Sequence, residues 1–213
     1  MPSGADTVTR LGDDLLGVDT DGAAEAQALA KTLRESGFWR DAVGGIDTVV
    51  AQFDPLQHAI DDAVARLQSA AQSIEPIDSA KAPSLEIPVV YDGEDLDHVC
   101  TRLELDRDEF IALHTREEYV VDMLGFVPGF TYVGGLDPAL DIARLTNPKP
   151  RVPAGSVGIA GGRTGLYALD SPGGWPIVGH TSMCLFDATA DDPFVLSAGM
   201  RIRFVSVDGG EAS

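Results

Sequence analysis

The residues best suited to bind an anion lie in the glycine- and proline-rich segment 125–181. Arg151 stands in the string PRVPAG, where the flanking prolines favour a rigid, extended backbone that would hold the guanidinium in one direction. Such a planar donor fork suits a carboxylate or a phosphate, although a solvated surface charge is the ordinary alternative. The pairs Gly161-Gly162 and Gly173-Gly174 either offer free backbone amides to an anion or form plain hairpin turns.

Two histidines near this segment, His114 and His180, could transfer protons at neutral pH. Spacing assigns neither of them to a Cys/His pair or a Ser/His/Asp order, so a structural role is the alternative for each. Ser156 in AGSVG resembles a nucleophile elbow, but an alanine takes the place of the first glycine of GxSxG. We therefore expect no hydrolase triad. Phe130 and Trp175 are either core residues or walls of a pocket.

Motifs of fixed spacing for nucleotides and metals do not occur in the chain. The string GxxxxGK[ST] is absent, and no GxGxxG opens a stretch that would form a helix. Cys100 and Cys184 are the only cysteines, and they lack the CxxC or Cys/His spacing of a zinc site. We expect two buried free thiols and no metal centre.

The charge of the chain argues against two classes of partner. Its net charge of -19 gives a field that repels nucleic acid and anionic membrane surfaces. Arg144, Lys149 and Arg163 form a local basic island near Arg151 within this acidic chain. The acidic surface serves solubility or, as we favour, adaptation to a salty cytoplasm, as in halophilic proteins.

Location follows from two features of the sequence. The first residues lack the basic start and the apolar run of a secretory signal. No stretch approaches the roughly 20 apolar residues of a membrane span. We expect a cytoplasmic protein.

The first part of the chain alternates helical and extended patterns. Apolar residues at helical spacing predict helices over 22–36 and 57–72, and a β-branched run predicts a strand over 46–53. Residues 73–84 lose all periodicity and contain two prolines, which is typical of a connector. We therefore place a domain boundary there.

The second part of the chain is dominated by short strands. We expect a strand over 85–91, a short helix over 95–103, a helical turn over 108–116 capped by Asp108, and a strand over 118–123. Further short strands between glycine and proline turns are predicted over 130–133, 157–160, 166–169, 177–178, 183–186 and 200–207. This pattern predicts a barrel or a sandwich.

Three strings in this part carry a family resemblance: GFVPGFTYVGGL, PRVPAGSVGIAGGRTGLYALDSPGGW and GHTSMCLFD. They resemble the family of the 5-oxoprolinase B subunit, also known as allophanate hydrolase subunit 1 and KipI-type proteins. The match is densest over 119–187. It implies an α+β fold, with a small α/β N-terminal domain over 1–78 followed by a cyclophilin-like β-barrel domain over 84–213.

The resemblance also implies a function and partners. Family members act as the B subunit of an ATP-dependent 5-oxoprolinase, together with a cyclophilin-like C subunit and an A subunit, and release glutamate from 5-oxoproline. ATP, with Mg²⁺, would be shared with the partner, and this chain would be inactive alone. Two alternatives stay open: a KipI-like inhibitor of a sensor histidine kinase, and an accessory protein of urea or allophanate metabolism.

The site candidates combine the residue types considered above with this resemblance. The catalytic candidates are His114, Arg151 and His180. The candidates for substrate binding are Phe130, Ser156, Gly161, Gly162, Thr164, Tyr167, Ser171, Gly173, Gly174, Trp175 and Thr181. The chain departs from the family pattern at Ala143-Arg144 and Lys149, where Pro-Arg pairs are usual. His180 stands where arginine is common, so an anion contact there would be weaker or pH-dependent.

Overall fold

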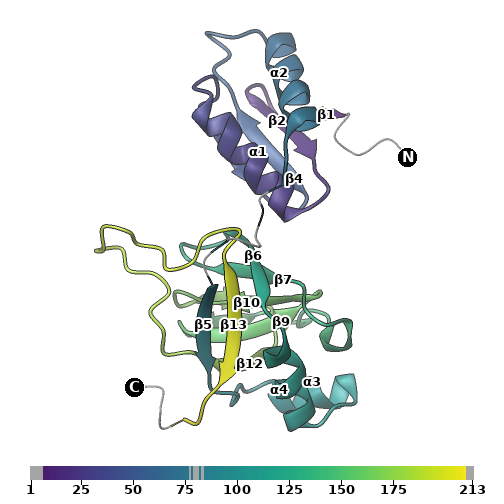
Figure 1. Ribbon diagram of the computed structural model, residues 1–213, viewed down its shortest axis with the longest axis vertical. Coiled ribbons are helices and arrows are strands. Elements are labelled where there is room, and N and C mark those ends of the chain that lie inside the picture. Colours follow the sequence, from purple (N-terminus) through teal and green to yellow (C-terminus); the bar gives the residue numbers. More distant parts are fainter. Residues whose placement is uncertain (1–6, 77, 79–81, 83, 210–213) are drawn as a thin grey trace. The chain divides into compact units, whose positions relative to one another are not determined.

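The chain divides into two compact units, Met1–Asp78 and Ser79–Ser213. Figure 1 shows both units in the computed structural model, which describes residues 7–76, 78, 82 and 84–209. The connector predicted over 73–84 is described only in part, because residues 77, 79–81 and 83 lie outside the described residues. Among the described residues, none of the helices is both long and apolar enough to cross a lipid bilayer.

The first unit is a four-stranded antiparallel sheet with two helices. The strand order is β1-β2-β4-β3. The elements are β1 (Val8–Arg10), β2 (Leu15–Asp19), α1 (Ala23–Glu35), β3 (Asp41–Gly44), β4 (Thr48–Gln52) and α2 (Ile60–Ser73). Both predicted helices and the predicted strand are present, whereas β1, β2 and β3 were not predicted, because their strands are short and interrupted by glycine or charge.

One face of this sheet is buried under the helices. Leu29 and Leu33 of α1 and Leu67 of α2 form one apolar cluster with Leu16 and Val49 of the sheet, and all five are almost completely buried. Side chains on one face recur about every 3.6 residues in a helix and every two residues in a strand. The apolar residues at these spacings therefore meet in the layer between the helices and the sheet.

The second unit is a nearly closed barrel. Its seven-stranded sheet has the order β12-β9-β10-β7-β6-β13-β5, and all neighbours are antiparallel except β13 and β5, which are parallel. The strands are β5 (Ser84–Val89), β6 (Tyr119–Leu124), β7 (Thr131–Gly134), β9 (Ser156–Ala160), β10 (Arg163–Leu166), β12 (Ile177–His180) and β13 (Arg201–Ser206). Val90 and His180 exchange two backbone hydrogen bonds of 2.9 Å and thereby join the two ends of the sheet. This confirms the predicted α+β fold with a barrel.

Several short elements surround the barrel. They are α3 (Leu96–Leu103), α4 (Arg107–Arg116), the 3-10 helix η3 (Pro138–Leu140), and the paired strands β8 (Lys149–Val152) and β11 (Ser171–Gly173). The predicted cap at Asp108 is wrong by two residues. Asp106 is the N-cap of α4, where it accepts a hydrogen bond from the Glu109 backbone amide while the Glu109 carboxylate accepts from the Asp106 amide.

Two predicted strands and one thiol differ from expectation. The strand expected over 166–169 lies earlier, as β10, and ends at Leu166. The segment 183–186 is not a strand, although Leu185 is buried, because this connection packs its apolar side chains on the barrel and forms only an isolated bridge at Phe186. Cys100 is buried as expected, but Cys184 is exposed.

Candidate functional site

Aromatic residues of the barrel unit enclose a small cavity of about 100 Å³, which we call the aromatic pocket. Ring centroids of Phe130 and Tyr167 lie 4.8 Å apart, and those of Tyr132 and Trp175 lie 5.9 Å apart, both edge to face. The pocket is lined by Phe126, Phe130, Tyr132, Arg144, Tyr167, Gly173, Gly174 and Trp175. These residues come from segments far apart in the sequence.

Glycines allow the rings of the aromatic pocket to approach the backbone. A Cβ at Gly165 of β10 would lie 2.8 Å from the Phe130 ring and 3.0 Å from the Trp175 ring. A Cβ at Gly173 would lie 2.2 Å from the Tyr167 hydroxyl oxygen. Both positions are closer than real Cβ contacts allow, so these glycines are required by the packing of the pocket.

Arg144 supplies the positive charge of the aromatic pocket. Its guanidinium carbon lies 5.7 Å from the centre of the Trp175 ring, and it forms no ion pair with any residue that the structure describes. Burial raises the pKa of the hydroxyls of Tyr132 and Tyr167. The charge of Arg144 opposes the shift at Tyr132, whereas at Tyr167 a hydrogen bond with the Trp175 backbone opposes it more than Arg144 does. Both hydroxyls therefore remain protonated at neutral pH and can donate hydrogen bonds.

Phe126 forms an exposed wall of the same pocket in a strained conformation. Its φ is 73°, and the Val127 amide donates to the Gly125 carbonyl, which makes a γ-turn of the rare kind with positive φ. The side chain is 63% exposed, yet its ring lies 5.8 Å from that of Phe130. Strain of this kind at a non-glycine residue concentrates at functional sites.

We expect Phe126→Gly to be more stable than Phe126→Ala by about 1 kcal/mol, because only glycine adopts a positive φ without steric cost. Both variants remove the same wall of the pocket and should bind a pocket ligand equally poorly. Denaturant unfolding and ligand titration of the two variants measure these quantities. Equal stability of the two variants would contradict the assignment of backbone strain to this position.

Five of the predicted site residues lie together in the aromatic pocket: Phe130, Tyr167, Gly173, Gly174 and Trp175. Three pocket residues were not predicted as site residues: Phe126, Tyr132 and Arg144. For Arg144, its position in the basic island was the sequence signal that could have indicated a site residue. Tyr132 had no such signal, because it lies in a predicted strand.

Arg151 is not free to bind an anion in this structure. Its guanidinium donates to one carboxylate oxygen of Asp170 at 2.9 and 2.6 Å, and the other oxygen of Asp170 accepts from the Ala154 amide. The amide and Arg151 lower the pKa of Asp170, which keeps it ionised. The charge of Arg151 is thus compensated by the chain itself, which argues against its predicted catalytic role.

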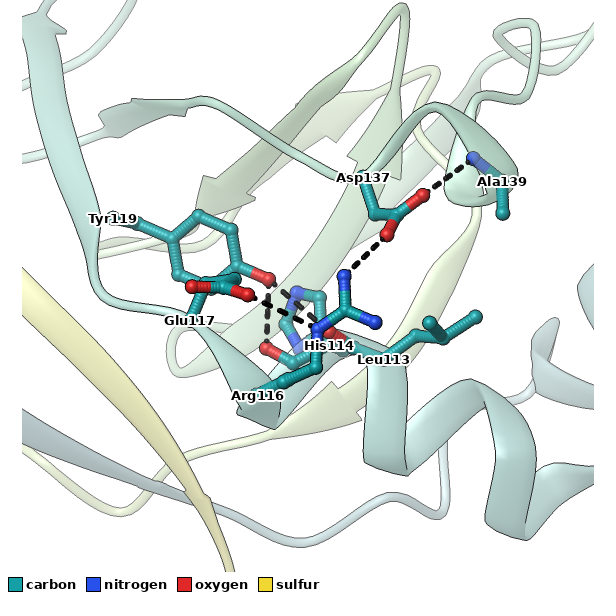
Figure 2. A network of polar contacts seen from close by, with 7 residues as sticks. All are labelled: Leu113, His114, Arg116, Glu117, Tyr119, Asp137 and Ala139. Carbon is teal, nitrogen blue, oxygen red and sulfur yellow. Dashed lines mark hydrogen bonds and ion pairs between the residues drawn. The ribbon is translucent and has the colours of Figure 1, made fainter.

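His114 is a core residue. Its side chain is completely buried, with Nδ1 2.6 Å from the Tyr91 hydroxyl and Nε2 2.8 Å from the Thr164 hydroxyl. Figure 2 shows its backbone carbonyl accepting a hydrogen bond of 3.0 Å from Tyr119. Burial lowers the pKa of His114 to about 3. Since both ring nitrogens are engaged and the side chain has no exposed surface, the structure argues against the catalytic role predicted for it.

The polar residues near the junction of β9 and β12 have mainly structural contacts. His180 is exposed, and its Nδ1 lies 2.7 Å from Asp92. Ser156 and Thr181 are buried, and the Thr181 amide donates to the Gly155 carbonyl. None of the three lines the aromatic pocket.

Gly161 and Gly162 form the turn between β9 and β10, with φ values of 56° and 69°. Their amides donate to the Ile142 carbonyl and to the Asp141 carboxylate, respectively. An external anion would have to displace the Asp141 carboxylate. The pair therefore forms a hairpin turn, which was the alternative to an anion site.

Ser171 is buried, and its hydroxyl has no partner among the described residues. Within the same residues, no three His, Cys, Asp or Glu side chains gather as a metal site requires. The aromatic pocket with Arg144 is therefore the candidate site of this chain.

Comparisons with known proteins assign the chain to a class of protein. The family model described as carboxyltransferase domain, subdomain C and D, matches residues 7–196. The 5-oxoprolinase B subunit of Escherichia coli O157:H7 is 40% identical over 171 residues, which are 78% of this chain and 77% of that protein. The chain belongs to the family of the 5-oxoprolinase B subunit, as its sequence strings predicted.

Solved structures share the fold of this chain. The crystal structure of TTHA0988 has a TM-score of 0.79 and 34% identity, and the match covers 92% of this chain but only 40% of the TTHA0988 chain. The urea amidolyase of K. lactis shares the fold, with a TM-score of 0.79 at 18% identity, over all of this chain and 16% of that one. This chain thus matches one part of these longer chains.

Proposed function

We propose that this chain is the B subunit of an ATP-dependent 5-oxoprolinase, which converts 5-oxoproline, ATP and water to glutamate, ADP and phosphate. The observation that carries the proposal is the aromatic pocket with Arg144, which has no carboxylate partner among the described residues, in a chain that belongs to this family. A small cavity with apolar walls and one cation suits a small cyclic carboxylate.

The chemistry of 5-oxoproline matches the groups in the pocket. Its five-membered lactam ring fits against aromatic faces, and its carboxylate suits the planar donor fork of Arg144. Tyr132 and Tyr167 carry protonated hydroxyls that can donate to the lactam oxygen. The pocket thereby recognises both ends of the substrate.

The reaction requires activation of a poor electrophile. The lactam oxygen attacks the γ-phosphorus of ATP, an O–P bond forms, and ADP leaves. Water then adds to the activated carbon, and cleavage of the C–N bond opens the ring to an acyl phosphate with a free amine. A second water hydrolyses this acyl phosphate to glutamate and phosphate. Positioned cations and hydrogen-bond donors stabilise the charge that develops in such steps.

The partners follow from the family and from the open site. The relatives are named as one subunit of an enzyme, which implies a complex of several chains. Phe126 and Arg144 are exposed at the pocket, so a second chain can complete the site. We propose that the cyclophilin-like C subunit covers this side, that ATP with Mg²⁺ is bound between the two, and that the A subunit completes ring opening.

Reconstitution with the C and A subunits of 5-oxoprolinase tests this function. The assembled complex should release glutamate from 5-oxoproline only when ATP is present, and the chain alone should not. No turnover from a complex that has been shown to assemble would refute the proposal. Binding to the dimerisation domain of a sensor histidine kinase by the same preparation would then favour the inhibitor role.

In that complex, Arg144→Gln should raise the KM for 5-oxoproline by at least about tenfold, because one charge-assisted hydrogen-bond pair to the carboxylate is lost. Arg203→Gln is the matched control, since Arg203 is an exposed arginine without an ion pair among the described residues and it lines no part of the pocket. Steady-state kinetics of both variants decide the point. An equal KM for the two variants would exclude Arg144 as a carboxylate ligand.

A further inference from the structure

A second depression adjoins the aromatic pocket on the barrel unit. Its volume is about 290 Å³, and His98, Arg102 and Arg144 are its basic residues, so we call it the basic depression. Arg144 lines both cavities, and Pro176 of the basic depression directly follows Trp175 of the aromatic pocket. The two cavities are therefore neighbours that share one guanidinium.

Two different segments bring these basic groups together. His98 and Arg102 are four residues apart on α3 and so lie on one face of that helix. Arg144 belongs to the connection between η3 and β8, which is tied down by a hydrogen bond of 2.7 Å from the Leu145 amide to the Gly174 carbonyl. The convergence of the three residues depends on the tertiary structure.

The arginines of the basic depression differ from most cations of the described residues in having no carboxylate partner there. Neither Arg102 nor Arg144 forms an ion pair or a side-chain hydrogen bond with a described residue. Most other basic side chains in the described part are paired with carboxylates, as in Arg10–Asp13, Arg40–Asp54, Arg66–Asp62, Arg107–Asp97, Arg116–Asp137, Lys149–Asp95, Arg151–Asp170, Arg163–Asp122 and Arg201–Glu118. In a chain with a net charge of -19, two adjacent unpaired guanidiniums are exceptional.

The acidic residues near His98 do not neutralise these arginines. Glu94 and Asp95 both contact the Lys149 ammonium, and Asp97 pairs with Arg107 at 2.7 Å. The neighbouring carboxylates are thus already engaged. Two like charges facing one depression repel each other, and a bound anion removes this repulsion.

We propose that the basic depression binds the phosphate groups of a nucleotide or of an inorganic polyphosphate. Two guanidiniums and an imidazole offer several donors to tetrahedral phosphate oxygens, and a guanidinium binds such oxygens in pairs. The volume of the basic depression is nearly three times that of the aromatic pocket. This volume is larger than a single carboxylate group would fill. The inference that the nucleotide is ATP rests on the proposed function. The inference of a phosphate site rests only on His98, Arg102 and Arg144.

The position of the basic depression fits a phosphoryl transfer. A phosphate held by Arg102 and Arg144 lies next to the pocket in which Arg144 also faces the substrate carboxylate. The shared guanidinium reduces the repulsion between the two anions and brings them close together. The arrangement places the donor and the acceptor of the phosphoryl group in adjoining cavities.

Binding to the isolated chain tests the proposal without any turnover. The chain has two tryptophans, so Trp39→Phe leaves Trp175 beside the two cavities as the only tryptophan fluorophore. Titration with tripolyphosphate and, separately, with ATP at low salt should give a saturable change in Trp175 fluorescence. Calorimetry on the unaltered chain provides a second measurement that does not depend on the Trp39 substitution.

Matched arginine variants locate the binding site. Arg102→Gln should weaken tripolyphosphate binding by at least about tenfold, because a charge-assisted hydrogen bond is lost. Arg203→Gln removes the same charge from another exposed, unpaired position and should leave the affinity within about twofold, since a distant surface charge is screened. Thermal unfolding of both variants confirms that they are folded.

The outcomes separate the possible ligands. Equal affinity for tripolyphosphate and ATP identifies the phosphate chain as the ligand, and tighter binding of ATP adds a contact to the nucleoside. No saturable signal in either measurement, or equal weakening by Arg102→Gln and Arg203→Gln, would overturn the proposal. Because neither 5-oxoproline nor a partner chain is present, failure of the oxoprolinase assay leaves this result intact.

Discussion

Acidification from pH 7 to pH 4 is expected to lower the free energy of unfolding of the barrel unit by about 3 kcal/mol through His114 alone. The unfolded chain binds a proton at this histidine near its ordinary pKa of 6.5, whereas burial lowers the folded pKa to about 3. Protonation therefore favours the unfolded state. The contribution of His114 is fully present above pH 6.5 and is lost at about 1.4 kcal/mol per pH unit as the pH falls toward 3.

Denaturant unfolding at several pH values measures this effect. His114→Gln keeps an amide that can contact the hydroxyls of Tyr91 and Thr164 but cannot titrate, so its stability should depend less steeply on pH. His98→Gln is the control, because His98 is exposed and its replacement should preserve the acid sensitivity. An unchanged pH slope in His114→Gln would show that other groups, such as the paired carboxylates, cause the acid sensitivity.

Gly173→Ala is expected to destabilise the protein by about 2–3 kcal/mol and to abolish ligand binding in the aromatic pocket. The new Cβ would lie 2.2 Å from the Tyr167 hydroxyl and 2.8–2.9 Å from its ring. Tyr167 is almost completely buried, so its ring has little room to move away. Either the ring shifts into the pocket or the strand β11 separates from it.

The next residue provides a matched control for this prediction. A Cβ at Gly174 would lie 3.7 Å from Pro148, an ordinary contact, so Gly174→Ala should change stability by less than about 1 kcal/mol. Thermal unfolding of the two variants measures the change in stability, and titration with 5-oxoproline in the assembled complex measures the change in ligand binding. Similar behaviour of the two variants would mean that Tyr167 does not require the glycine.

Several elements of the fold were predictable because their signal is local. The helices α1 and α2 have apolar residues at helical spacing, and β13 alternates buried apolar and exposed residues. The short strands β8 and β11 contain proline or glycine and were not predicted. Their pairing with each other, rather than their composition, makes them strands.

The candidate site was only partly predictable for a related reason. Trp175 and Phe130 were candidates for substrate binding, with a core role as the alternative, and the turn around Trp175 was the local signal for a pocket. Arg151 looked equally well placed, yet Asp170, which lies 19 residues later, engages its guanidinium. Arg144 was noted as part of a basic island and as a departure from the family pattern, but not as a site residue, because the absence of a described ion partner depends on its neighbours in three dimensions.

The sequence by itself determined the family, the two-part architecture with a barrel, and the segment that holds the candidate site. Glycine strings, prolines and the spacing of apolar residues act through the local backbone, so their effects can be predicted from the sequence. Only the tertiary structure decided which charges are free to bind a ligand. Folding pairs Arg151 with Asp170, buries His114 between two hydroxyls, and leaves Arg102 and Arg144 beside adjoining cavities. These outcomes depend on contacts between residues far apart in the chain, which no local pattern encodes.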